Sequence, residues 1–265
     1  MNHKSPWHAR LARTLAIILP LFLMAAALGT KFGLWSWQAG LGAVGLGGLI
    51  LIGLTALVSI ISIVLILHSG SKLGMVSAVF GLVVALGFTG LFAPVVMGAG
   101  DHPIHDMSTD TQDPPAFSDA VLAARAQSDS NPLNDYATPL GQTEQFKGAE
   151  APLSGKTTSD IVAENYPELE PLTLGDDTDP DAAVNALQLA MADMGFSNIR
   201  FNPEAGTVEG VAETFWFGFK DDVVARVSEG QIDFRSVSRV GQSDLGANAK
   251  RIMKLRAMTA ERLGL

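Results

Sequence analysis

The sequence predicts a two-part protein: an α-helical membrane region with three transmembrane helices, then a small α+β domain with an antiparallel sheet and two helices. Charge predicts this division first. Residues 1–100 carry five basic side chains and no acidic one, whereas the other 165 residues carry 13 basic and 27 acidic side chains, a net charge of −14. In addition, the first part holds three long uncharged stretches, and the last part shows helix and strand patterns.

The uncharged stretches predict the membrane spans. A helix needs roughly 20 apolar residues to cross about 30 Å of hydrocarbon. The stretches after Arg13 and after Lys72 each supply one span. The 40 residues between Lys31 and Lys72 could hold two, but that would leave no polar turn, so we predict one span entered through a loop with interfacial tryptophans. The expected spans lie near residues 12–29, 40–67 and 73–97.

The first span could alternatively be a cleaved signal peptide. Its start is basic, and Ala25, Ala26 and Ala27 offer small residues for cleavage. Two further spans follow immediately, so we expect this helix to be retained as an anchor. Both alternatives leave the C-terminal domain on the same side of the membrane.

Short-loop charge predicts the orientation. The N-terminal arm and the loop at residues 68–72 together carry four Lys or Arg, against one in the loop around Lys31. The excess of positive charge places the N-terminus in the cytoplasm, and three crossings place the C-terminal domain outside. In a Gram-negative bacterium, this predicts a multi-pass inner-membrane protein with a periplasmic domain.

Small residues within the spans predict close helix packing. They recur every four positions in the third span, at Ser77, Gly81, Ala85 and Thr89. This ladder suits packing against the other spans or, alternatively, against a membrane-protein partner or a second copy. The segment at residues 40–45 matches a dinucleotide-binding glycine pattern, but it lacks the preceding strand and the following acidic residue that such binding needs. We expect the lipid bilayer as a partner, with no nucleic acid and no cofactor.

Residues 101–177 form a segment rich in proline. Nine of the 13 prolines lie between Asp101 and Asp181, which favours extended, irregular chain packed on the surface of the soluble domain. One short helix is expected at residues 117–127, capped by Ser118 or Asp119.

Residues 178–265 are expected to form the α+β core. Asp179 and Pro180 suit the start of a helix that ends at Gly195. Two hairpins and a closing helix follow. Their expected ranges are strands at 198–202, 207–214, 216–227 and 231–240, and a helix at 247–263.

Strand alternation predicts a charged patch. If the charged faces of the last two strands coincide, five Asp and Arg side chains gather on one side of the sheet, and three polar residues continue this run toward the final helix. Arginine forks bind phosphate or carboxylate, so the set is a candidate site for an anionic or hydroxylated ligand. The alternative is a ladder of mutually satisfied ion pairs under the proline-rich segment. The candidates are Asp222, Arg226, Asp233, Arg235, Arg239, Asp244, Asn248 and Arg251.

Other chemistry has weak support. His102, His105, Asp106 and Asp110 are spaced as metal ligands could be, but Pro103 and the polar sequence favour a loop, so we expect no metal site. We identify no catalytic residues. Residues 241–265 carry five basic and two acidic side chains, and this basic helix could contact anionic lipids or, as we favour, the acidic segment of its own chain.

Several motifs resemble a known family. IHDMSTDTQDPPAF (104–117), AENYPELEPL (163–172), FGFKDDVVARV (217–227) and IDFRSVSRVGQSDLGANAKRI (232–252) are similar to the bacterial family catalogued as domain of unknown function 1499. The resemblance covers about residues 101–260. It implies a cell-envelope protein without an assigned reaction, and it implies that residues 104–117 belong to the folded domain. It supplies no catalytic residues.

We therefore expect a non-enzymatic inner-membrane protein whose envelope domain binds a ligand or partner. Two alternatives stay open: an envelope enzyme that uses the Asp/Arg patch on a lipid or sugar, and an accessory subunit of a membrane complex.

Overall fold

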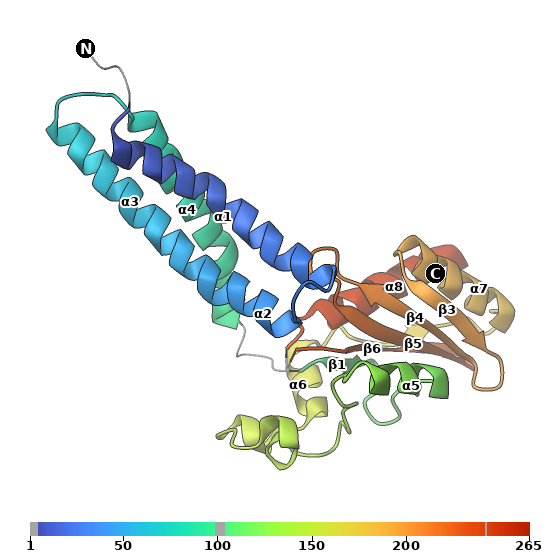
Figure 1. Ribbon diagram of the computed structural model, residues 1–265. Helices are drawn as coiled ribbons and strands as arrows, with labels where there is room; N and C mark the ends of the chain where they lie inside the picture. The colour runs from blue at the N-terminus through green and yellow to red at the C-terminus, as the bar shows by residue number, and fades with distance from the viewer. Residues whose placement is uncertain (1–4, 99–103, 242) are drawn as a thin grey trace. The chain divides into compact units, whose positions relative to one another are not determined.

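The computed structural model describes residues 5–98, 104–241 and 243–265, which form two parts (Figure 1). The first part is helical. It comprises α1 (Trp7–Lys31), a continuous helix made of α2 (Trp37–Gly42), the π-helical turn η1 (Ala43–Gly47) and α3 (Gly48–His68), and then α4 (Met75–Gly98). These are three helices long and apolar enough to cross a membrane, so the predicted helical class is confirmed. The glycine pattern at residues 40–45 is helical and is not a strand-to-helix turn.

The helical bundle buries many of its small residues and exposes many of its large apolar ones. Ala12, Ser59 and Ala85 are fully buried, whereas Leu57 and Leu86 are more than half exposed. Gly81 allows α4 to approach the other helices, since a Cβ atom there would lie 2.3 Å from the Ser59 hydroxyl and 3.3 Å from the Ala12 Cβ. A bundle with small residues inside and large apolar side chains outside is suited to a hydrocarbon solvent.

The second part is an α+β domain built on a six-stranded antiparallel sheet. The strand order is β1 (Asp106–Ser108), β6 (Gln231–Ser238), β5 (Lys220–Ser228), β4 (Thr207–Glu213) and β3 (Ser197–Asn202), and β2 (Leu172–Thr173) also pairs with β6. The sheet class is therefore confirmed, and two short strands join the four that the pattern predicts. The β5 strand begins at Lys220 and not at Trp216, because the chain first turns through Gly218 with φ +67°.

Helices cover both faces of the sheet (Figure 1). On one face lie α7 (Pro180–Asp193) and α8 (Ala247–Leu263), which bury the main apolar core with side chains such as Leu187, Phe234 and Ile252. On the other face lies α5 (Asp119–Gln127), where Phe117 and Val121 pack against Val224 and Val237.

The segment before α7 is mostly irregular but folded. It holds three short 3₁₀ turns, η2 (Leu140–Gln142), η3 (Glu144–Phe146) and η4 (Leu153–Gly155), and the helix α6 (Thr158–Asn165). A capping box between Thr157 and Asp160 starts α6, and Ile161 and Val162 contribute to the main core. We call residues 104–136, which carry β1 and α5 across the sheet, the strap.

Candidate functional site: a buried ion-pair layer

The register of β5 and β6 places the predicted charges on one face. Asp222 lies opposite Val237, Val224 opposite Arg235, and Arg226 opposite Asp233. Since side chains alternate along a strand, all these residues point to the face that carries the strap. The predicted Asp/Arg patch therefore exists as a continuous layer between the sheet and the strap.

Arg235 is held by a carboxylate of the strap. Its Nε donates to Asp106 Oδ1 at 3.0 Å and its Nη2 to Oδ2 at 2.7 Å, and both side chains are at most 5% exposed. The Tyr136 hydroxyl donates to the same carboxylate at 2.6 Å. Burial alone would lower the pKa of Arg235, but the hydrogen bonds and charge of Asp106 outweigh it and raise that pKa. The pair is a bidentate, fully desolvated clamp.

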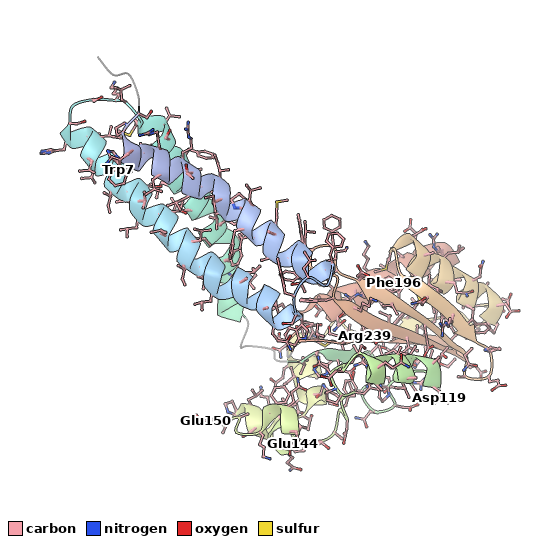
Figure 2. The ribbon with its side chains drawn as sticks, viewed as in Figure 1. Trp7, Asp119, Glu144, Glu150, Phe196 and Arg239 are labelled. Atoms are coloured by element: carbon pink, nitrogen blue, oxygen red, sulfur yellow. The ribbon has the colours of Figure 1, made fainter. Side chains whose placement is uncertain are left out.

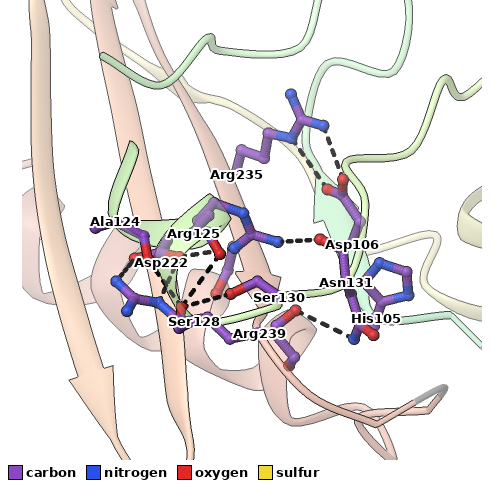
Figure 3. A network of polar contacts seen from close by, with 12 residues as sticks. His105, Asp106, Ala124, Arg125, Ser128, Ser130, Asn131, Asp222, Arg235 and Arg239 are labelled. Carbon is purple, nitrogen blue, oxygen red and sulfur yellow. Dashed lines mark hydrogen bonds and ion pairs between the residues drawn. The ribbon is translucent and has the colours of Figure 1, made fainter. Parts of the chain in front are cut away.

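Asp222 is shared by two arginines (Figure 3). Arg239 donates to it from Nε at 3.0 Å and from Nη2 at 2.7 Å, and Arg125 of α5 donates from Nη1 at 2.7 Å. Arg125 also donates to the Asn131 carbonyl at 2.8 Å. One carboxylate thus faces two guanidinium groups, which leaves this end of the layer with one excess positive charge.

Arg226 has the opposite arrangement. Its guanidinium lies 2.8 Å from Asp113 Oδ2, 3.2 Å from Asp233 Oδ2 and 3.6 Å from Asp110 Oδ2. Burial would lower the pKa of Arg226, but the contacts with Asp233 and Asp113 raise it. Together with Asp106, these contacts tie three carboxylates of the strap to the sheet.

The remaining predicted residues lie on the other face of the sheet, under the start of α8. Asn248 is fully buried, and its side chain bonds to Ser236, Ser238 and the His105 carbonyl. Asp244 accepts from the backbone of Gly246 and Asn248 at 2.8 and 2.7 Å and so caps the helix. Burial raises the pKa of Asp244. The sheet therefore divides the eight predicted residues into five on the strap face and three beneath α8.

Among the described residues, the basic side chains of α8 form no ion pair with acidic residues of the proline-rich segment, contrary to expectation. Arg251 pairs with Asp221 of β5, and Arg262 pairs with Asp193 of α7. Arg256 does contact the segment, but through the Pro171 carbonyl at 3.0 Å. The reason is geometric, because α8 packs beside α7 and over the sheet, whose carboxylates are nearer.

The described residues among those considered as metal ligands have other partners. His105 is buried, and its Nε2 lies 2.9 Å from the Pro132 carbonyl while its Nδ1 lies 3.2 Å from Gln145 Nε2. Burial lowers the pKa of His105, which favours the neutral ring. Asp106 belongs to the Arg235 clamp, and His102 lies outside the described residues. Across residues 5–98, 104–241 and 243–265, no three His, Cys, Asp or Glu side chains gather as a metal site would require.

A small groove opens at the positive end of the layer, between α5 and the strands β3 and β4. Its volume is about 50 Å³, and its charged lining residues are Arg200, Glu209 and Arg239. Of the labelled residues in Figure 2, Arg239 belongs to the sheet wall of this groove, and Asp119 marks the start of α5, which forms the other wall. Glu209 lies opposite Arg200 in the register but accepts hydrogen bonds from the Ser118 hydroxyl and backbone instead. Within the described part of the chain, no ion pair involves the exposed Arg200.

Sequence reasoning did not identify Arg200, Arg125 or Asp106 as members of this region. No sequence pattern distinguishes Arg200, because the β-bulge beside it, where Asn198 adopts φ +54°, is visible only in the structure. Asp106 lies in the three-residue strand β1 and Arg125 in the short helix α5, and they are 129 and 97 residues from their partners, so no periodicity could connect them.

Fold and site define a class of protein: a three-helix region of membrane type joined to an α+β domain whose sheet is strapped by buried ion pairs. The chain belongs to the family described as protein of unknown function (DUF1499), whose model matches residues 106–258. The match begins at β1 and ends within α8, so the family unit includes the strap. Searches among curated proteins and among solved structures found no match to this chain.

Proposed function

We propose that this protein is anchored in the bacterial inner membrane and presents a periplasmic domain that binds a ligand or partner without catalysing a reaction. The three apolar helices and the excess of Lys and Arg on the N-terminal side support this orientation. The pairing of Arg125, Arg226, Arg235 and Arg239 with carboxylates supports a structural role for most of the Asp/Arg layer.

Fusions at the C-terminus test the orientation. Alkaline phosphatase fused after Leu265 is expected to be active, because it folds only outside the cytoplasm, while a fluorescent protein that matures only in the cytoplasm is expected to be dark there. The same two reporters fused before Trp7 should give the reverse pattern. An inactive phosphatase fusion together with a fluorescent reporter fusion, each after Leu265, would overturn the proposed orientation.

The groove at Arg200 carries the binding proposal. Arg200 brings a guanidinium that is not engaged in an ion pair with any described residue, and the Arg125–Asp222–Arg239 cluster adds one excess positive charge beside it. Glu209 offsets one of these charges, which leaves the groove with a net charge of +1. Residues 101–240 as a whole carry 8 basic and 25 acidic side chains, so this site stands out within an acidic domain.

The size of the groove limits what it binds. One water molecule needs about 10–15 Å³ of cavity volume, so about 50 Å³ admits one small group and not a whole sugar or nucleotide. We therefore propose that it receives a terminal phosphate or carboxylate of an envelope molecule, held by the arginine fork. The residues Asp244, Asn248 and Arg251 are outside this groove, and a ligand role for them stays a prediction.

Phosphate titration tests this binding. Inorganic phosphate is expected to raise the unfolding temperature of the full chain in detergent, compared with chloride at equal ionic strength, because a ligand that binds only the folded state stabilises it. Arg200→Gln should abolish the increase. Arg262→Gln, which removes an exposed arginine of α8, should retain it. An equal increase in both variants, or none in the natural chain, would contradict the proposal.

Two other functions stay predictions. An enzyme acting through the Asp/Arg patch would need one of these buried pairs to open. Association with another membrane protein through Ser77, Gly81, Ala85 and Thr89 would use only part of that ladder, because Gly81 and Ala85 are already buried within the bundle while Thr89 is exposed.

A further inference from the structure

The loop between β4 and β5 is unusually aromatic. Residues 214–219 read TFWFGF, with four aromatic side chains in six positions. Phe215 is 73% exposed and Trp216 is 48% exposed, and their rings meet edge to face at 5.1 Å. Each such side chain buries about 150–250 Å² when it is covered, so leaving the pair exposed sacrifices much of the stabilisation that burial of their apolar surface would provide.

Scattered exposed apolar residues are normal, but this pair is different in arrangement. Within the described part of the domain, residues 104–241 and 243–265, the other large apolar side chains that are exposed stand singly: Leu122, Leu189, Phe201, Leu245 and Leu265. Phe215 and Trp216 are adjacent and lie at the tip of a hairpin. Contiguous exposed apolar surface of this kind marks a contact with a protein or a membrane.

The register places this loop at the end of the sheet where the chain arrives from the membrane helices. Asp106 of β1 and Asp222 of β5 both lie opposite Val237 of β6. Strands are about 4.8 Å apart, so the start of β1 and the start of β5 are only about 10 Å from each other across the sheet. The turn at Glu229 lies at the other end of β5, roughly 30 Å away along a strand of nine residues.

The length of the chain before β1 restricts the distance from the bilayer. Five residues separate Gly98 of α4 from Ile104, and six consecutive Cα steps of about 3.8 Å span at most about 23 Å. Ile104, just before β1, is therefore at most about 23 Å from the last residue of α4, so this tether leaves the aromatic loop within reach of a bilayer that α4 spans.

We propose that Phe215 and Trp216 insert into the interfacial layer of the bilayer and dock the domain on the membrane. Aromatic rings, and tryptophan above all, favour this layer, where the ring is apolar and the indole N–H reaches water or headgroups. The inference rests on the proposed membrane anchoring of the helices. It commits to lipid as the occupant because a short tether keeps the domain within reach of the bilayer in which the helices are anchored.

Single cysteines test the docking, since the chain has no natural cysteine. Leu57→Cys in α3, Phe215→Cys in the loop and Glu229→Cys at the opposite turn are each labelled with an environment-sensitive fluorophore. The full chain is then placed in nanodiscs with or without spin-labelled lipids. We expect the labels at positions 57 and 215 to lose most of their emission with the quenching lipids, and the label at 229 to lose little.

The three positions separate the two proposals. A label that is quenched at 57 but not at 215 overturns the docking while leaving the anchoring intact, and a label that is unquenched at 57 overturns both. Equal quenching at 215 and 229 would also overturn the docking, because it would reflect general proximity to lipid.

A second measurement avoids changing the loop. Trp7, Trp35 and Trp37 are replaced by Phe, so that Trp216 alone reports. Its emission should be blue-shifted in nanodiscs and quenched by brominated lipids; emission at the wavelength of water-exposed tryptophan, unaffected by these lipids, would overturn the docking.

Discussion

Arg235 and Asp106 show how a charged side chain is tolerated inside this domain. Their side chains are 5% and 0% exposed, and each charge is compensated by the other. Asp106 also accepts hydrogen bonds from the Tyr136 hydroxyl and the Asn134 backbone N–H. Two aromatic rings complete the environment of Arg235. Its guanidinium carbon lies 5.7 Å from the centroid of the Phe117 ring and 5.4 Å from the centroid of the Tyr136 ring. The energetic importance of the pair therefore lies in the cost of removing one partner.

The first prediction concerns that cost. Arg235→Met leaves a buried, unpaired carboxylate and is expected to lower the free energy of unfolding by about 3–5 kcal/mol, whereas adding Asp106→Leu should recover much of the loss. Denaturant unfolding of the full chain in detergent, followed by circular dichroism, measures both. Arg262→Gln breaks a partly exposed pair and should cost less than about 1 kcal/mol. A similar cost for Arg235→Met and Arg262→Gln would show that the clamp is not energetically special.

The second prediction concerns pH. Burial lowers the pKa of His105 below its usual 6.5, so its contribution to stability is present above that value and is lost as the pH falls below it. We expect the unfolding temperature of the domain to fall between about pH 7 and pH 5. His105→Gln should weaken this dependence, because the substitute does not titrate. The same slope in both proteins would exclude His105 as its source.

Among the elements, those with a repeating pattern were predictable from the sequence and those fixed by distant contacts were not. The helices α7 and α8 show apolar spacing with clear ends at Asp179 and Gly264. In contrast, β1 has three residues and β2 has two, too few to show alternation. They are strands only because the edge of β6 offers them hydrogen bonds.

The candidate site divides in the same way. Alternation along β5 and β6 identified the arginines and aspartates of the sheet, because a period of two is visible in a single strand. Their partners Asp106 and Arg125 are supplied by tertiary packing of the strap. Ser118 is another case: it stands at the expected cap of α5, but its hydroxyl donates to Glu209 across the groove and caps nothing.

The third prediction concerns the packing of α4. Gly81→Val places a side chain against Ser59 and Ala12 and should destabilise the helical bundle by about 1–3 kcal/mol. Gly87→Val is the matched control, since no atom lies within 4 Å of a Cβ built there and the change in helix propensity is the same. Thermal unfolding in detergent compares the two. Equal stability of both variants would mean that the approach at Gly81 is not needed.

At the scale of the whole molecule, the strap makes the C-terminal domain depend on a segment that looks like a linker. The strap supplies a partner for Arg235 and for Arg226 and covers the apolar pair Val224 and Val237. Without it, Arg235 would lose the carboxylate of Asp106, and Arg226 would keep only Asp233.

The fourth prediction follows from this dependence. A fragment of residues 178–265, although it contains four strands and two helices, is expected to be unfolded, while a fragment of residues 104–265 should fold. Amide chemical-shift dispersion in nuclear magnetic resonance spectra distinguishes them. A dispersed spectrum for the shorter fragment would show that the ion-pair layer is dispensable for folding.

The pairing of β1 with β6 also has a consequence during synthesis. Asp106 leaves the ribosome 129 residues before Arg235, and translation at about 5–20 residues per second makes that interval roughly 6–26 s. Throughout this time the strap has been made but the strand that holds it has not. The domain therefore closes only when almost its whole length has been synthesised, and a chain stalled before Arg235 would present its strap, with Phe117 and the lone carboxylate of Asp106, to any chaperone or protease that meets it first.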